Sequence, residues 1–198
     1  MKEQFFKISA IKRQKIEQCA IQEFADHFYY EASLNNIIKQ SRVSKGGLFK
    51  YIDSKEDLYL YLFEKHIIEL IEYQVKNLST DIIDFLDRLK DLAYLSVDYY
   101  KNNNNVYSFV LNALTDYSST VYNKVITIRN STVQKYQHQL LLGVSFSNYR
   151  YPKAQMLELY QWVSSAVNQS ISNKNSIEDI LIKLDLLVDV LKNGVVRR

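Results

Sequence analysis

Proline and glycine are scarce in this chain, with one proline and four glycines among 198 residues. A β-sandwich or another turn-rich fold needs many more of both, whereas helix interiors tolerate neither well. Hydrophobic residues make up 47% of the chain, which is typical of a globular protein rather than a disordered one. We therefore predict an all-α fold.

Short helical patterns follow one another closely after the first helix. Ser33 is a good N-cap for a helix over 34–41, and a tight break follows at 41–43. Ser44 caps a second short helix, and Ser54 opens the next one. Two short helices joined by a tight turn predict a helix-turn-helix, whose second helix, the recognition helix, enters the DNA major groove.

Charge in the first part of the chain suits a nucleic-acid partner. Residues 1–53 hold nine Lys/Arg against six Asp/Glu, and the remainder holds sixteen of each, so the whole net charge of +3 lies in this quarter. Lys12 belongs to a basic cluster near the start of a helix predicted over 9–28, where it suits phosphate contact; a merely solvated basic end is the alternative. Lys45 begins the recognition helix and can reach a guanine edge or a phosphate.

The recognition helix has an unusual composition. Gly46 and Gly47 occupy its first turn, where each costs about 1 kcal/mol relative to alanine. They leave room for the backbone to approach the floor of the groove, and stability alone does not explain them. Phe49 and Tyr51 cannot both face the core, because residues i and i+2 point to different sides of a helix. One of them is therefore expected at a contact surface.

These residues resemble the N-terminal domain of TetR-type (TetR/AcrR) transcriptional regulators. The matching segments are 43–52, 54–58 and the pair Phe24-Ala25. The resemblance implies that Lys45 and Gly46 lie against base edges, that Lys50 and Tyr51 touch backbone or bases, and that Ser33 and Lys55 hold phosphates through helix starts. The predicted DNA-binding residues are Lys12, Ser33, Ser44, Lys45, Gly46, Gly47, Phe49, Lys50, Tyr51 and Lys55.

Three residues depart from the family pattern. Gly47 stands where a threonine or similar side chain often contacts DNA, and Phe49 replaces a common tyrosine. Phe28 replaces the glycine that usually ends the first helix. Gly47 predicts fewer base-specific contacts than the family usually makes, and Phe49 lacks the hydroxyl of the tyrosine.

The resemblance also implies two domains. We expect a three-helix DNA-binding domain over 1–53, a connecting helix from residue 54, and a larger helical ligand-binding and dimerisation domain over 54–198. Amphipathic patterns in that second part predict long helices over 54–76, 81–101, 106–117, 121–142 and 152–171, and a last helix that ends at Gly194.

Aromatic residues are abundant in the second part. Five of them fall on helices that would converge in the family's architecture: Tyr94, Phe109, Tyr117, Tyr122 and Trp162. Rings with a polar group suit an adaptable apolar pocket, so an apolar or aromatic effector is expected, with a cationic one as the weaker option. Plain core and interface packing is the alternative for each of these side chains.

The last two helices are the predicted dimer interface. The last helix sets a wide stripe of Leu, Ile and Val on one side, and the resemblance implies a four-helix bundle to which each subunit gives two helices. The expected interface residues are Val163, Val167, Leu184, Val188 and Leu191.

Motifs for chemistry are missing from the sequence. Cys19, the single cysteine, is expected to be a small buried thiol. His27, His66 and His138 are scattered, so we predict no metal site, and we expect no cofactor and no enzyme activity. No apolar run approaches the roughly 18 residues that span a bilayer, and no signal-type apolar segment opens the chain, so a cytoplasmic location is expected.

The sequence favours a homodimeric regulator, most often a repressor in that family, that a small molecule releases from operator DNA. The alternative is a helical interaction module whose helix-turn-helix no longer binds DNA specifically.

Overall fold

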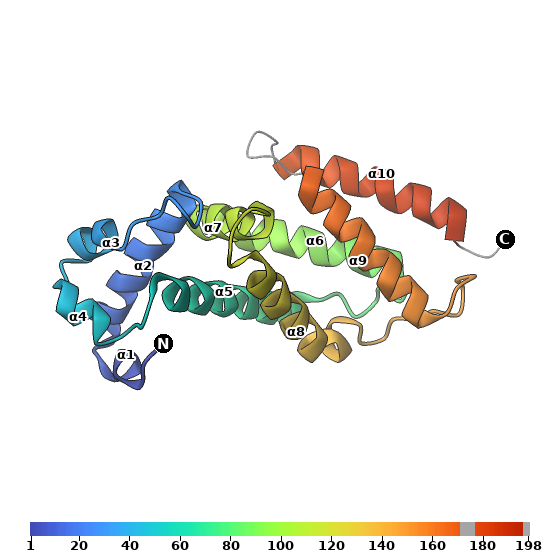
Figure 1. Ribbon diagram of the computed structural model, residues 1–198. Coiled ribbons are helices and arrows are strands. Elements are labelled where there is room, and N and C mark those ends of the chain that lie inside the picture. The colour runs from blue at the N-terminus through green and yellow to red at the C-terminus, as the bar shows by residue number, and fades with distance from the viewer. Residues whose placement is uncertain (171–176, 196–198) are drawn as a thin grey trace. The chain divides into compact units, whose positions relative to one another are not determined.

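The computed structural model describes the backbone of residues 1–170 and 177–195, and within them every side chain except those of 160, 163–170, 177, 178, 180 and 195. The described residues form helices and no extended strand, which confirms the all-α prediction (Figure 1). The helices are α1 (Glu3–Lys7), α2 (Ala10–Asp26), α3 (Leu34–Ser41), α4 (Lys45–Phe49), α5 (Lys55–Asn77), α6 (Phe85–Lys101), α7 (Asn104–Thr115), α8 (Tyr122–Leu140), α9 (Lys153–Ser170) and α10 (Ile177–Val195).

The chain divides into two compact units, which are described separately. Unit 1 comprises residues 1–70 and 102–134, and unit 2 comprises residues 71–101 and 135–198. The long helices α5 and α8 therefore contribute to both units. Unit 1 joins the predicted helix-turn-helix to α7, although the two are far apart in the sequence.

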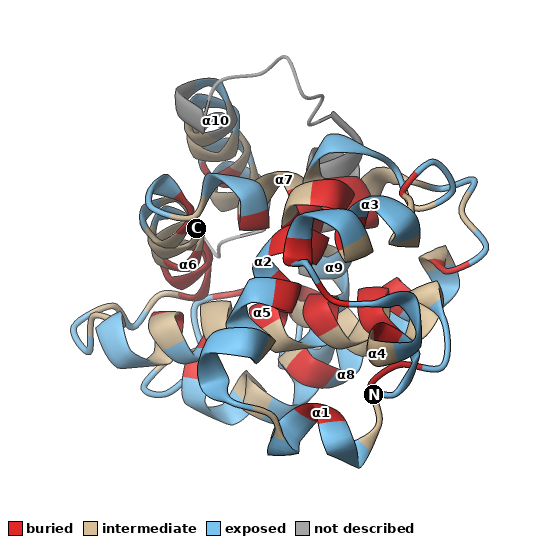
Figure 2. Ribbon diagram, turned by 90° about the vertical axis from the view of Figure 1, so that its left-hand side faces the viewer, coloured by how far each residue is buried: buried red, intermediate tan, exposed pale blue. Residues whose placement is uncertain are grey.

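The core of unit 1 is built on the apolar face of α2. Ile16, Ala20 and Phe24 have no exposed surface, and this buried face is visible in Figure 2. The Phe24 ring lies 4.8 Å from that of Tyr59 and 5.7 Å from that of Phe109, while Tyr59 and Phe109 are 5.1 Å apart. These three rings bury the junction of α2, α5 and α7 and favour each other through edge-to-face and tilted contacts.

A buried amide joins α7 to the end of α2. The side-chain nitrogen of Asn112 donates to the carbonyl oxygens of Phe24 (3.2 Å) and Ala25 (3.0 Å). The last carbonyls of a helix have no partner within the helix, so a donor from elsewhere satisfies them. Asn112 therefore fixes the C-terminal end of α2 against α7.

A fully buried arginine organises unit 2. Arg88 is 1% exposed, and its guanidinium donates to four carbonyl oxygens. Nη1 reaches Leu140 (2.9 Å) and Leu142 (3.2 Å) at the end of α8, and Nη2 reaches Ser79 (2.9 Å) and Ile82 (2.8 Å) in the segment before α6. One side chain thus ties two segments together that are more than fifty residues apart in the sequence.

Helix α6 begins with its own cap and packs against α10. Asp84 Oδ1 accepts from the backbone N–H groups of Leu86 (3.0 Å) and Asp87 (3.1 Å), and Asp84 Oδ2 accepts from the hydroxyl of the buried Tyr149 (2.8 Å). Asp84 is therefore an N-cap with a buried partner. A carboxylate at this position satisfies N–H groups that lack partners in the helix.

The predicted first helix ends earlier than expected. It was placed over 9–28, but α2 stops at Asp26, since His27 adopts an extended conformation. Phe28, the last residue of the predicted helix, consequently lies outside it and is 42% exposed. A further short helix, α1, precedes α2 and was not predicted. Pro152 stands just before α9, rather than inside its first turn.

Candidate nucleic-acid interface

The first helix and the turn of the helix-turn-helix have the predicted bounds, whereas α4 ends at Phe49, so that Tyr51 lies beyond it. Helix α3 ends at Ser41, Arg42 adopts a left-handed conformation (φ 57°), and Ser44 begins α4. The Ser44 hydroxyl accepts a hydrogen bond from the Gly47 backbone N–H (3.0 Å), as an N-cap should. Figure 1 shows α3 and α4 beside α2 within this part of the unit. A left-handed residue other than glycine is strained, and Arg42 is where the chain turns between the two helices.

Helix α4 presents most of its surface to solvent. Leu48 is its one buried residue and anchors it in the core. Lys45, Lys50 and Phe49 are exposed, the last by 37% of its surface. Tyr51, in contrast, is 8% exposed. Of the two aromatic residues that could not both face the core, Phe49 is therefore the one at the surface.

The two glycines of α4 differ in their surroundings. A methyl group added at Gly46 would meet nothing within 4 Å, so the backbone there is open to a close approach. A Cβ at Gly47 would lie 2.9 Å from the Ser44 hydroxyl oxygen and 3.0 Å from Val43 Cγ1. The lack of a side chain at Gly47 therefore leaves space for Ser44, which caps the same helix. This steric reason stands beside the predicted approach of the backbone to the groove, which stays a prediction for both glycines.

Lys12 and Tyr51, both predicted DNA contacts, lie against each other. The Lys12 ammonium donates to the Tyr51 hydroxyl (3.1 Å) and is 5.4 Å from the ring centroid. Lys12 is exposed, so it remains available to a phosphate. Tyr51 is buried, so little of its side chain is open to a ligand.

Ser33 stands at the N-cap position of α3, but its side chain makes no capping hydrogen bond. Its backbone N–H donates instead to Glu23 Oε1 (2.8 Å), which also accepts from the Asn36 side chain (3.1 Å). Glu23, 3% exposed, therefore fixes the start of α3 from α2. The phosphate contact expected at Ser33 stays a prediction.

Lys55 has a structural role that the sequence did not indicate. Its ammonium donates to the carbonyl oxygens of Tyr29 (2.6 Å), Ala32 (2.8 Å) and Tyr30 (3.3 Å), and lies 4.6 Å from the Tyr29 ring centroid. Burial lowers the pKa of Lys55, and the Glu23 carboxylate opposes that shift. Since these carbonyls occupy the three ammonium protons, the side chain is not set up to hold a phosphate. A contact at this position would have to come from the backbone at the start of α5.

The five aromatic residues predicted to bind a ligand are divided between the units. Phe109, Tyr117 and Tyr122 belong to unit 1, and Tyr94 and Trp162 belong to unit 2. Phe109 has no exposed surface and packs between Phe24 and Tyr59, so for this residue the core-packing alternative describes the contacts. The rings of Tyr117 and Tyr122 lie 5.1 Å apart, and Tyr117 is 48% exposed.

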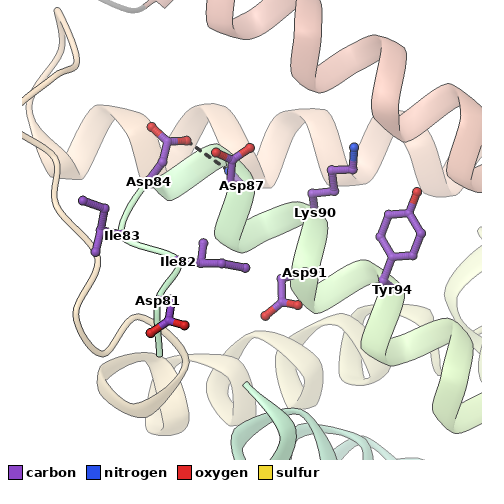
Figure 3. Close-up of a pocket in the computed structure, with 8 residues that line it drawn as sticks. All are labelled: Asp81, Ile82, Ile83, Asp84, Asp87, Lys90, Asp91 and Tyr94. Carbon is purple, nitrogen blue, oxygen red and sulfur yellow. Dashed lines mark hydrogen bonds between the residues drawn. The ribbon is translucent and has the colours of Figure 1, made fainter. Parts of the chain in front are cut away.

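Tyr94 lines a pocket in unit 2 that is rich in carboxylates (Figure 3). The pocket encloses about 520 Å³ and is formed by Asp81, Ile82, Ile83, Asp84, Asp87, Lys90, Asp91 and Tyr94. In Figure 3, Asp84, Asp87, Lys90 and Tyr94 lie along the same side of α6. Several of these groups already have partners, because Lys90 pairs with Asp185 (2.9 Å) and Asp87 pairs with Lys192 (2.5 Å).

Helix α10 turns a different side outward from the one expected. Val188, a predicted interface residue, is 5% exposed in a helix that packs against α6 of its own unit, and Leu184 and Leu191 are half-buried. The exposed apolar residues are Ile182 (66%), Leu186 (65%) and Val190 (60%), spaced one turn apart. Val188 therefore packs within its own unit, and its place in a dimer interface stays a prediction. Val163 and Val167 lie outside the side chains that the structure describes.

Cys19 is buried, as predicted. Across the described part of the chain, no group of three or more His, Cys, Asp and Glu side chains could hold a metal ion. None of the described helices is long and apolar enough to cross a membrane.

The sequence match to known families covers the helix-turn-helix. Residues 18–62 match the model of bacterial regulatory proteins of the tetR family. The fatty acid metabolism regulator protein of Bacillus subtilis (strain 168) is 29% identical over 72 residues, which cover 35% of this chain. The match spans only 37% of that relative's length.

Solved structures share the fold of the whole chain. A TetR family transcriptional regulator from Chloroflexus aurantiacus J-10-FL matches with a TM-score of 0.66 and 18% identity, covering 100% of this chain and 99% of its own. A protein from Saccharomonospora viridis, described as a transcriptional regulator and solved in complex with choline, matches with a TM-score of 0.67 and 18% identity, covering 96% and 100%. The helix-turn-helix thus matches the tetR family of bacterial regulatory proteins, and the whole chain shares its fold with solved TetR family structures.

Proposed function

We propose that the chain is a homodimeric repressor that binds operator DNA through α4 and releases it when a small molecule binds. The observation that carries the proposal is the exposed recognition helix, which leaves Lys45, Gly46 and Lys50 open to a groove while Leu48 holds it in the core. Lysines can reach a guanine edge or a phosphate from there, and Gly46 lets the backbone come close.

Selection of duplexes from a randomised pool tests DNA binding directly. The wild-type protein should enrich a palindrome whose half-sites lie about one helical turn apart, because a two-fold dimer places two recognition helices in successive major grooves. Lys45→Ala should weaken binding to that duplex by about 1–3 kcal/mol if Lys45 reads a guanine. Enrichment of no sequence would instead favour the helical module that no longer binds DNA specifically, a reading that Gly47 and the small charge surplus support.

The homodimer would use the outward stripe of α10. Ile182, Leu186 and Val190 form a row of exposed apolar side chains on one side of the helix, and a second copy of the chain would bury them. This row replaces Leu184, Val188 and Leu191 in our proposal, since those residues are wholly or partly buried within unit 2.

Sedimentation at micromolar concentration tests the dimer. Leu186→Lys should yield a folded monomer, because it places a charge in the middle of the apolar row without disturbing the contacts of Val188. The matched control is Asn193→Lys, which adds the same charge at an exposed polar position of the same helix and should remain dimeric. A wild-type monomer would contradict the proposal.

For the effector we propose an apolar or aromatic molecule, with a cationic one as the second class to test. The names of two similar proteins supply concrete compounds, a fatty acid and choline. The carboxylates around Tyr94 favour a cation electrostatically, whereas the aromatic residues suit either class.

The fluorescence of Trp162, the single tryptophan, provides the assay. A true effector should change it and also weaken binding to the selected duplex, and the duplex must lower effector affinity by the same factor. A compound that binds but leaves DNA affinity unchanged would be an occupant rather than the signal.

A further inference from the structure

The recognition helix is too short to hold its own geometry. Helix α4 has five residues, two of which are glycines, and only Leu48 is buried. A helix of this length is not stable by itself, and glycine weakens it further. Its direction must therefore be set by contacts that the rest of the domain makes with it and with the residues that follow.

Residues 2–6, which we call the N-terminal strap, supply such contacts at the C-terminal end of α4. The Lys2 backbone N–H donates to the carbonyl oxygen of Tyr51 (2.8 Å). The Lys2 ammonium donates to the carbonyl oxygen of Phe49 (2.9 Å) and pairs with the Asp53 carboxylate (2.8 Å). The last carbonyls of a helix lack partners and carry a partial negative charge, so a cation there is favourable.

Phe5 anchors the strap in the core. Its side chain has no exposed surface, and its ring lies 6.1 Å from that of Tyr51 and 5.7 Å from that of Tyr61. Tyr51 is thus held at its carbonyl by Lys2, at its ring by Phe5 and at its hydroxyl by Lys12. The strap therefore contacts Tyr51, which lies two residues beyond the end of the recognition helix.

We propose that the N-terminal strap orients the recognition helix for DNA binding and that Lys2 is a positioning residue rather than a DNA contact. The proposal rests on the proposed function in one respect, namely that α4 binds DNA. The order that Lys2 gives to α4 does not depend on it and can be measured without DNA.

The chain contains a matched control for Lys2. Lys7 lies in the same short segment and pairs only with Glu3 of its own helix among the described contacts (2.6 Å), with 67% of its side chain exposed. Lys2→Ala and Lys7→Ala remove the same charge from nearly the same place, but only the first releases the end of α4. Lys2→Arg keeps the charge and the donors, so it should restore most of what Lys2→Ala loses.

Two measurements decide the proposal. Amide hydrogen exchange reports the order of residues 45–52 in the free protein, and it should quicken in Lys2→Ala but not in Lys7→Ala. Affinity for the duplex that the wild type selects should fall about tenfold in Lys2→Ala, which corresponds to about 1.4 kcal/mol, and change little in Lys7→Ala. The slope of affinity against salt should be the same in both variants, because each would lose the same long-range charge.

Other results would overturn the proposal. If the salt slope drops by about 1 more in Lys2→Ala than in Lys7→Ala, Lys2 holds a phosphate and is a DNA contact. Equal affinity and equal exchange in both variants would show that the strap does not order α4. Faster exchange with unchanged affinity would show that the order is irrelevant to DNA.

A failure of the proposed function has a distinct result. If the wild type enriches no duplex, DNA binding by α4 is wrong, and the exchange of residues 45–52 still decides whether the strap orders the helix. Phe5→Leu provides a second variant, since it keeps an apolar side chain in the core and should fold. It should speed exchange at 45–52 in the same direction as Lys2→Ala.

Discussion

Lys55 and Arg88 both place a cation among backbone carbonyl oxygens, but they do so over very different distances in the sequence. Lys55, in unit 1, binds three carbonyls of one short loop, residues 29–32, and is only partly buried. Arg88, in unit 2, is fully buried and binds carbonyls of two segments, one just before α6 and the other at the end of α8. Lys55 therefore fixes the 29–32 loop, whereas Arg88 connects two segments of unit 2.

The two units are stabilised in different ways. Unit 1 rests on a helix-turn-helix with local caps and a ring cluster, so the loss of one polar contact leaves most of it in place. Unit 2 depends on one buried side chain for contacts to four carbonyls in two segments, and the contact to Leu140 is fully buried, where an unpaired group is expensive. Disruption of Arg88 should therefore be the more damaging change.

The largest expected effect is that of Arg88→Met. The substitution keeps an apolar chain of similar length but leaves four carbonyls without a donor, which should lower the free energy of unfolding by about 3–5 kcal/mol. Urea unfolding followed by circular dichroism measures it. Arg150→Met, at an exposed position of the same unit, is the control and should change little. A loss below about 1 kcal/mol would mean that water replaces the guanidinium easily.

Asn112→Leu extends the comparison to a long-range contact within unit 1. Phe24 and Ala25 would lose the donor to their carbonyls, so we expect a loss of about 1–3 kcal/mol, between the effects of Arg88 and Lys55. The same unfolding experiment applies, with Asn123→Leu, an exposed asparagine of unit 1, as the reference. If Asn112→Leu proved as damaging as Arg88→Met, the contrast between the two units would disappear.

Lys55→Met separates stability from DNA binding. It should cost about 1–2 kcal/mol, because the carbonyls of the 29–32 loop remain near solvent and can be hydrated. Affinity for the selected duplex should show an unchanged salt slope, since the ammonium serves the loop. Lys50→Met is the matched comparison: Lys50 is exposed at the end of the recognition helix, so stability should hold while affinity and salt slope fall. The reverse pattern would restore Lys55 as a phosphate contact.

The smallest expected effect is a gain. Arg42 is strained at a φ of 57°, and Arg42→Gly should raise the free energy of unfolding by about 0.5–1 kcal/mol by removing that strain. Arg42→Ala keeps the strain and should bring no such gain. Thermal unfolding of the three proteins would reveal the order, and a destabilised glycine variant would show that the Arg42 side chain makes a contribution larger than its strain.

The helix-turn-helix could be predicted from the sequence because its caps are contacts between residues close together in the chain. The Ser44 cap binds a backbone N–H three residues away, and Ser54 does the same for Asp57 (3.1 Å). The spacing of Ile16, Ala20 and Phe24 likewise predicted the buried face of α2. All of these depend on neighbours within one or two turns, where residue type and spacing are sufficient to predict the contact.

Contacts between distant residues were decided only by the tertiary structure. No pattern in the sequence indicates that Lys55 serves a loop 23–26 residues before it, that Arg88 ties the end of α8, or that Lys2 meets the end of α4 47 residues away. The wide apolar pattern of α10 was visible, but which side faces outward depends on where α6 packs. Composition and periodicity thus determined the helices and the DNA-binding motif, whereas the partners of buried polar groups depend on which carbonyls the folded chain leaves unpaired, and that is a property of the assembled fold.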